Sequence, residues 1–155
     1  MFAGKHGEDY LSYPMIDHIY NKDVLRLAAN ISRTNPLKLP DAQASLRSPL
    51  CGSTIDVDLQ IERGRVSDYS HTIKACALGQ ASASVLANNV IGKNADDIQN
   101  VRDQLELMLL DNGAPPKGHW KALNALQPAK DAKPRHGAIL LPFDAVLKGL
   151  RDFKL

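Results

Sequence analysis

The chain has 155 residues and a mass of 16.9 kDa, the size of one domain able to bury its own hydrophobic core. Its apolar fraction of 44% and charged fraction of 23% are typical of globular proteins, so intrinsic disorder and collagen-like repeats are excluded. The net charge of +2 comes from lysines and arginines spread along the chain, so we expect no nucleic-acid partner. No apolar run approaches the roughly 18–20 residues of a membrane span, so we expect no membrane partner.

Residues 1–13 are predicted to form a loose N-terminal arm, and residues 14–155 a single domain. The arm lacks the apolar stretch of a secretory signal and contains acidic residues, which transit peptides avoid. The expected location is therefore the cytoplasm, where Cys51 and Cys76 would be free thiols, ligands or core residues rather than a disulfide. Because the chain has no Cys-x-x-Cys motif, a zinc finger and a thioredoxin-type site are excluded.

The first half of the chain predicts a helix followed by a small sheet. Pro14 suits the first turn of a helix, and apolar residues then recur at helical spacing as far as Ile31. Prolines leave a loop over residues 34–41. Residues 55–62 alternate between apolar and polar side chains, as a half-buried strand does, and a tight turn leads into a second strand over 66–74. An antiparallel hairpin is therefore expected.

The sequence predicts two further features of this sheet. A change of parity after Val66 predicts a β-bulge near Ser67 and Asp68. A third strand is predicted over residues 42–47. The sheet should therefore be a meander of two to three strands.

The second half of the chain is predicted to be helical. Helices are expected over residues 77–90, 95–110, 119–126 and 138–151. The core face of the second should consist of Ile98, Val101, Leu105, Met108 and Leu109. Asn94 followed by Asp97 is typical of a helix N-terminus, and residues 127–134 are predicted to be a polar link. Strands first and helices after them indicate an α+β fold, with a small antiparallel sheet packed by about five helices.

Cys51 and Cys76 are the candidate functional residues. Cys51 lies in a turn just before the strand over 55–62, where the adjacent Gly52 lets the backbone turn sharply. Cys76 lies at the start of a helix, where the helix dipole favours a thiolate. Because a hairpin returns the end of its second strand to the start of its first, both thiols should lie at one end of the sheet. The alternative that the pattern leaves open is that both are small core residues.

Three segments carry a family resemblance. Pro49-Leu50-Cys51-Gly52 is similar to Asn-Pro-x-Cys-Gly-Asp, and Cys76-Ala77-Leu78-Gly79-Gln80-Ala81-Ser82-Ala83-Ser84 is similar to Cys-Ala-Ile-Ser-x-Ala-Ser-x-Ser. Ile16-Asp17-His18-Ile19-Tyr20-Asn21 is similar to Ile-x-Asp-His-Tyr-x-Asn-Pro. Over roughly residues 14–153 the chain thus resembles the U-type (NifU-like) iron–sulfur cluster assembly scaffolds, with Arg135 in a segment that resembles the insertion of their SUF-type branch. The resemblance implies a transient iron–sulfur cluster or zinc as cofactor, and a cysteine desulfurase and acceptor apo-proteins as partners.

The same resemblance implies an incomplete ligand set. In the family, three cysteines and an aspartate hold iron–sulfur or zinc; carried over by position, two of the cysteines are Cys51 and Cys76. The aspartate position is Ser53 and the third cysteine position is Ala138. Two thiolates alone do not complete a tetrahedral site, and a serine hydroxyl is a poor metal ligand near neutral pH.

A substitute ligand is one way to complete the site. His136 lies two residues before Ala138 and is the first candidate, with Asp144 or His71 behind it. The alternative is that His136 is a histidine in the loop before the last helix and binds no metal.

Three functions remain open. The first is a non-catalytic scaffold or sulfur-accepting protein, in which Cys51 or Cys76 takes persulfide sulfur from a cysteine desulfurase and iron or zinc is bound. The second is a degenerate paralogue that acts as an interaction protein without stable metal binding, and so without a cofactor. The third is a thiol-dependent enzyme that uses Cys76 with His71 or His136 as base, for which no further motif is present. The sequence leaves the oligomeric state open.

Overall fold

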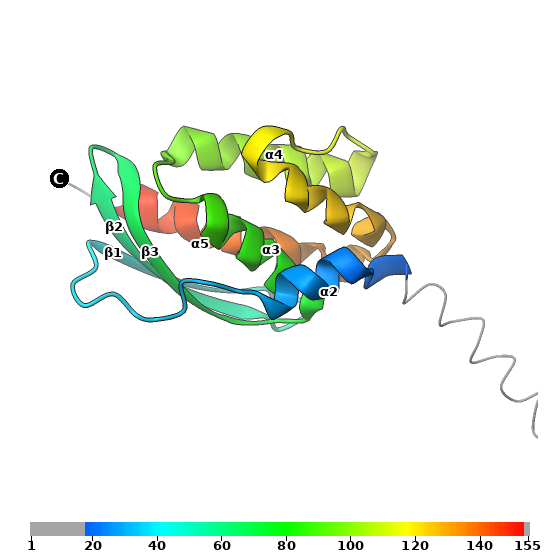
Figure 1. Ribbon diagram of the computed structural model, residues 1–155, viewed down its shortest axis with the longest axis horizontal. Helices are drawn as coiled ribbons and strands as arrows, with labels where there is room; N and C mark the ends of the chain where they lie inside the picture. The colour runs from blue at the N-terminus through cyan, green and yellow to red at the C-terminus, as the bar shows by residue number, and fades with distance from the viewer. Residues whose placement is uncertain (1–17, 154–155) are drawn as a thin grey trace, which may run out of the picture.

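The structure is a computed structural model that describes residues 18–153 (Figure 1). A three-stranded antiparallel sheet packs against α3 (Ala77–Asn89) and α5 (His136–Asp152), and α4 (Ala95–Asp111) packs on α5 on the side away from the sheet. The prediction of an α+β fold with a small antiparallel sheet is confirmed. The predicted arm, residues 1–13, lies outside the described residues, and the assignment of 14–155 to one domain stays a prediction.

The sheet has the strand order β1-β2-β3 and contains the predicted third strand. Its strands are β1 (Ala42–Arg47), β2 (Thr54–Glu62) and β3 (Arg65–Lys74). Ile55, Val57 and Leu59 of β2 are buried because alternate residues of a strand point to the same face. The predicted bulge is also confirmed: Gln60 faces Asp68 and Ile61 faces Val66, which leaves Ser67 unpaired.

The first described helix, α2 (Lys22–Ala29), is shorter than the sequence predicts. The Asn21 side chain accepts a hydrogen bond from the Val24 amide at 2.9 Å, and this N-cap fixes the start of the helix after Tyr20. The predicted helix was to run without a break from Pro14, and its part before residue 18 lies outside the described residues. The prediction of a continuous helix is therefore wrong within residues 18–31.

The helix α4 confirms its predicted cap and core face. The Asn94 side chain accepts from the Asp97 amide at 2.8 Å and the Asp97 carboxylate accepts from the Asn94 amide at 3.0 Å, which makes a capping box. The apolar residues of its predicted face are all buried: Ile98, Val101, Leu105, Met108 and Leu109.

The segment before α5 differs from the prediction. In place of a short helix and a polar link, the chain forms the 3₁₀ helix η1 (Gly118–Asp131) and the short η2 (Lys133–Arg135). Leu123, Leu126 and Ala129 are fully buried and recur every three residues, which is the period of a 3₁₀ helix. The buried face of η1 therefore extends into residues 127–131, which the sequence predicts to be part of a polar link. Among the described helices, we find none with the length and hydropathy that crossing a bilayer requires.

One polar side chain of β3 is held inside this core. His71 is 2% exposed, and its Nε2 donates to the Ser32 carbonyl at 2.9 Å while its Nδ1 is buried without a hydrogen-bond partner. Burial lowers the pKa of His71 from its ordinary value of 6.5, although the hydrogen bond to Ser32 acts in the opposite direction.

His71 should make the folded state sensitive to acid. Because its pKa is lower folded than unfolded, the unfolded chain binds the proton more tightly, and this contribution to stability is lost as the pH falls below about 6.5. We expect His71→Gln, whose amide can still donate to Ser32, to lose less melting temperature than the wild type between pH 7.5 and 5.5, measured by circular dichroism. His119→Gln, at an exposed position, is the matched control. An identical loss in His71→Gln and wild type would contradict this role.

Candidate functional site

Three segments of the chain meet beyond the open end of the β2–β3 hairpin, where Thr54 faces Lys74. They are the β1–β2 turn with Cys51, the start of α3 with Cys76, and the start of α5. The close packing around two glycines shows that these segments are in contact. A Cβ atom added to Gly137 would collide with the Ser48 hydroxyl, and one added to Gly79 would lie 3.3 Å from the Cβ of Ala138. The two cysteine-bearing segments therefore both pack on the first turn of α5.

Cys51 lies in a tight turn that exposes its thiol. The Ser48 amide donates to the Ser53 carbonyl and the Gly52 amide to the Ser48 carbonyl, each at 2.8 Å, and Gly52 takes a φ of +74° that favours glycine. The Cys51 Sγ lies 3.2 Å from the Ser53 Oγ. The sequence-predicted projection of Cys51 from a loop is thus what the structure has.

The surroundings of Cys51 favour its thiolate. Partial burial raises the pKa of the thiol, but hydrogen bonds from the Ser48 and Ser53 side chains and from the backbone outweigh that effect. The net result is a lowered pKa, which increases the fraction of thiolate, the nucleophilic form of cysteine, at neutral pH.

Cys76 is half-buried at the N-cap of α3, and its side chain makes no capping hydrogen bond. Two side chains from distant parts of the chain surround it. The pKa of Arg135 is raised, first by a hydrogen bond with Cys76, then by the charge of Tyr20, and also by the charges of Cys76 and Cys51. The Arg135 guanidinium lies 5.8 Å from the centre of the Tyr20 ring.

Tyr20 responds to the same group of charges. Burial raises its pKa, and the negative charge of Cys76 and a hydrogen bond with Cys76 raise it further, while Arg135 acts in the opposite direction. From the sequence, Arg135 was expected, by resemblance alone, to be a surface contact for a sulfur donor, and Tyr20 was expected on a helix. The positions of both in the resembling motifs were the available signal for their role.

The candidate substitute ligands have other partners. The Nε2 of His136 donates to the Ala129 carbonyl at 2.8 Å, and this side chain is only 7% exposed. The Asp144 carboxylate accepts from Arg102 at 2.8 Å, and the Nε2 of His71 donates to Ser32. His136 as a metal ligand stays a prediction, for which the geometry offers no support.

The donor set does not fit a four-ligand metal site. Within residues 18–153, no group of three or more His, Cys, Asp or Glu side chains is placed to hold a metal ion. Ser53 contributes a neutral hydroxyl beside Cys51, and Ala138 is fully buried with no donor atom. A cationic guanidinium, rather than a further anionic ligand, lies beside Cys76. The site therefore presents two thiols with separate hydrogen-bond partners.

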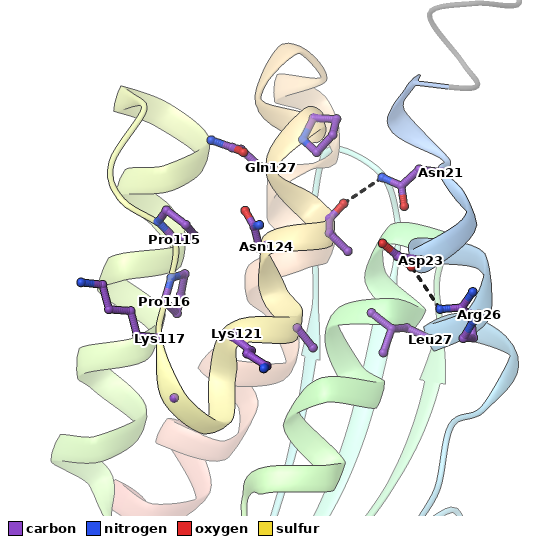
Figure 2. A pocket seen from close by; sticks show the side chains of 14 residues that line it. Asn21, Asp23, Arg26, Leu27, Pro115, Pro116, Lys117, Lys121, Asn124 and Gln127 are labelled. Carbon is purple, nitrogen blue, oxygen red and sulfur yellow. Dashed lines mark hydrogen bonds and ion pairs between the residues drawn. The ribbon is translucent and has the colours of Figure 1, made fainter.

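A groove lies away from the cysteine site. It has a volume of about 800 Å³ and runs between α2 and η1, with Asn21, Asp23 and Arg26 on one wall and Lys121 and Asn124 on the other (Figure 2). None of the residues that line it belongs to the cysteine site. We place the chemistry at the thiols because they are reactive groups with a perturbed environment.

Comparison with known proteins shows which family the chain belongs to. Residues 19–131 match the model of the NifU-like N terminal domain family. A crystal structure of a nitrogen-fixing NifU-like protein (N-terminal) from Brucella abortus is 48% identical, with a TM-score of 0.84 over 88% of this chain and 95% of that one. The chain belongs to the NifU-like N-terminal domain family, which is the family of iron–sulfur cluster assembly scaffolds.

Two further relatives are more distant. The iron-sulfur cluster assembly scaffold protein IscU of Thermotoga maritima is 33% identical over 58 residues, which span 37% of this chain and 41% of the length of that curated relative. A putative scaffold protein for the SUF system from Fervidobacterium islandicum has a TM-score of 0.77 over 86% of this chain and 98% of that one. At 16% identity this second likeness shows the fold alone.

Restoring the family ligands should create a metal site. We expect Ser53→Asp combined with Ala138→Cys to bind zinc at least about 100-fold more tightly than the wild type, or roughly 2.7 kcal/mol, because it supplies the third thiolate and the carboxylate of a tetrahedral site. Competition with a chromophoric chelator measures the affinity, and the two single variants are the controls. A folded double variant with wild-type affinity would show that these positions do not face a common site.

Proposed function

We propose that this chain is a sulfur-accepting member of the scaffold family, which takes persulfide sulfur from a cysteine desulfurase at Cys51. The observation that carries the proposal is the exposed Cys51 thiol, whose pKa is lowered by the serines of its own turn. Family membership supports a role in iron–sulfur cluster assembly. We place this function in the cytoplasm and in the SUF-type branch, and propose no enzymatic turnover.

The transfer needs only a thiolate and an accessible donor. The Cys51 thiolate attacks the terminal sulfur of the donor persulfide, a new sulfur–sulfur bond forms on Cys51, and the donor cysteine leaves as a thiolate. Every atom is accounted for, and no metal takes part in the step. A lowered pKa increases the fraction of Cys51 that is ready to react.

Two other functions make different demands on the site. A degenerate paralogue that acts only through its surface is favoured by Ser53 and Ala138, and in that case Cys51 would not accept sulfur. A thiol-dependent enzyme would need a base for Cys76. The Nδ1 of His71, its basic nitrogen, is buried without a hydrogen-bond partner, and among the described residues no hydrogen bond joins Cys76 to His71 or His136. The geometry thus favours sulfur acceptance over the enzyme.

Loading with a small persulfide tests the proposal. After anaerobic treatment with glutathione persulfide, we expect Cys76→Ser to gain the mass of one sulfur atom on the peptide that contains Cys51. Cys51→Ser should gain none at that peptide, and little elsewhere, because the remaining thiol of Cys76 is half-buried. Intact-protein and peptide mass spectrometry measure the product. Equal loading of the two variants would overturn Cys51 as the acceptor.

The residue before Cys51 offers a contact for the donor protein. Leu50 is 80% exposed in the same turn, so an apolar side chain stands beside the reactive thiol. Burying such a side chain against a partner favours association. We propose that Leu50 contacts the desulfurase during transfer.

A surface variant separates docking from chemistry. Leu50→Ser should raise the concentration of the organism's own cysteine desulfurase needed for half-maximal sulfur transfer by about tenfold, or roughly 1.4 kcal/mol. Its reaction with glutathione persulfide should be unchanged. Leu39→Ser is the matched control, because Leu39 is 81% exposed near the other end of β2, where the Gln60 side chain donates to its carbonyl. Equal effects of Leu50→Ser on both donors would contradict a docking role.

A further inference from the structure

We propose that Cys76 resolves the persulfide of Cys51, so that the site releases sulfide and closes a Cys51–Cys76 disulfide. This inference rests on the proposed sulfur acceptance at Cys51 and adds the fate of the sulfur. It assigns Cys76, which the transfer step does not use, a chemical role of its own.

The fold places the two thiols at the same end of the hairpin. Thr54 and Lys74 are paired across β2 and β3, and such partners have Cα atoms about 4.5–5.5 Å apart. Cys51 precedes Thr54 in a tight turn, and Cys76 follows Lys74 after one residue. Both cysteine segments pack on the first turn of α5, through Ser48 and Gly79. Most of the residues between the two thiols in the sequence belong to the β2–β3 hairpin, whose two ends lie side by side.

The charges around the thiols point to the same proximity. Both Cys76 and Cys51 act on the pKa of Arg135, so its guanidinium lies within electrostatic reach of the two sulfurs. Arg135 is the last residue of η2 and the N-cap of α5, and it is exposed. Arg135 also forms a hydrogen bond with Cys76, so a cation lies directly beside the resolving thiol.

Because the chain lacks two of the family's four ligands, its two thiols are available for this reaction. In a four-ligand site both thiolates would be bound to a metal and unavailable as nucleophiles. Here Ser53 and Ala138 supply no anionic donor, and both cysteines are free thiols. Two free thiols with different exposure form a natural pair, with exposed Cys51 as the acceptor and half-buried Cys76 as the resolving thiol.

The step is balanced without an external oxidant. The Cys76 thiolate attacks the Sγ of Cys51, the Cys51–Cys76 bond forms, and the terminal sulfur leaves with its proton as hydrosulfide. The sulfane sulfur is reduced to sulfide, and the two cysteines are oxidised to a disulfide. A dithiol reductant returns both thiols for the next cycle. The Cα atoms must come within about 7 Å for the bond to close.

Single-turnover sulfide release tests the inference. Wild-type protein is loaded anaerobically with glutathione persulfide, freed of excess donor, and left without reductant. We expect one sulfide released per persulfide formed, the loss of both free thiols, and a peptide pair that joins Cys51 to Cys76 in mass spectrometry. Cys76→Ser should keep its persulfide and release sulfide at least about tenfold more slowly. Ala75→Ser, which keeps both thiols, is the matched control and should behave as the wild type.

The outcomes distinguish the two proposals. If neither wild type nor Cys76→Ser becomes loaded, sulfur acceptance itself fails. If both load and release sulfide at the same rate, or wild type keeps its persulfide and forms no disulfide, acceptance stands and resolution by Cys76 is overturned. A release rate that rises with protein concentration would show attack between chains and would also overturn the inference. Cys76→Ala provides a second variant if the serine disturbs the start of α3, and circular dichroism confirms its fold.

Discussion

The pairing of β2 with β3 is the constraint on which the rest of the structure depends. It sets Thr54 opposite Lys74, and this register brings the turn before β2 and the helix after β3 to one end of the sheet. A slip of one residue would turn the buried residues of β2 to the other face and would shift Cys51 relative to Cys76. The bulge at Ser67 belongs to the same constraint, because it lets Val66 and Tyr69 both be buried although they are three residues apart.

Small residues allow the helices to complete the site. Gly79 of α3 lies against Ala138 of α5, and Gly137 lies against Ser48 of the Cys51 turn. These contacts hold the starts of both helices close to the sheet, where Arg135 reaches the thiols. In the family pattern a serine occupies the position of Gly79 and a cysteine that of Ala138. Neither position carries a polar side-chain atom in this chain, and Ala138, the ligand position on α5, is fully buried.

Local patterns predicted the elements whose period is two or 3.6 residues. The alternation of Ile55, Val57 and Leu59 gave β2, and Asn94 with Asp97 fixed the start of α4. The 3₁₀ helix η1 was not predicted, because its buried residues recur every three positions, a period that is neither that of a strand nor that of an α-helix. The position of Tyr20 beside Cys76 could not be predicted either, since it depends on how segments far apart in the chain pack.

Electrostatics distinguishes this pair of thiols from the full ligand set of the family. Three thiolates and a carboxylate held together would repel one another strongly, and a bound metal ion relieves that repulsion. This chain has replaced one thiolate and the carboxylate with Ala138 and Ser53, and it gives each remaining sulfur its own partners. Ser48 and Ser53 surround Cys51, whereas Arg135 and Tyr20 surround Cys76. Arg135 thus interacts with Tyr20 as well as with the two sulfurs. Substitution of the ligands therefore supports the proposed sulfur chemistry, since it leaves two thiols without the other two ligands of the family's metal site.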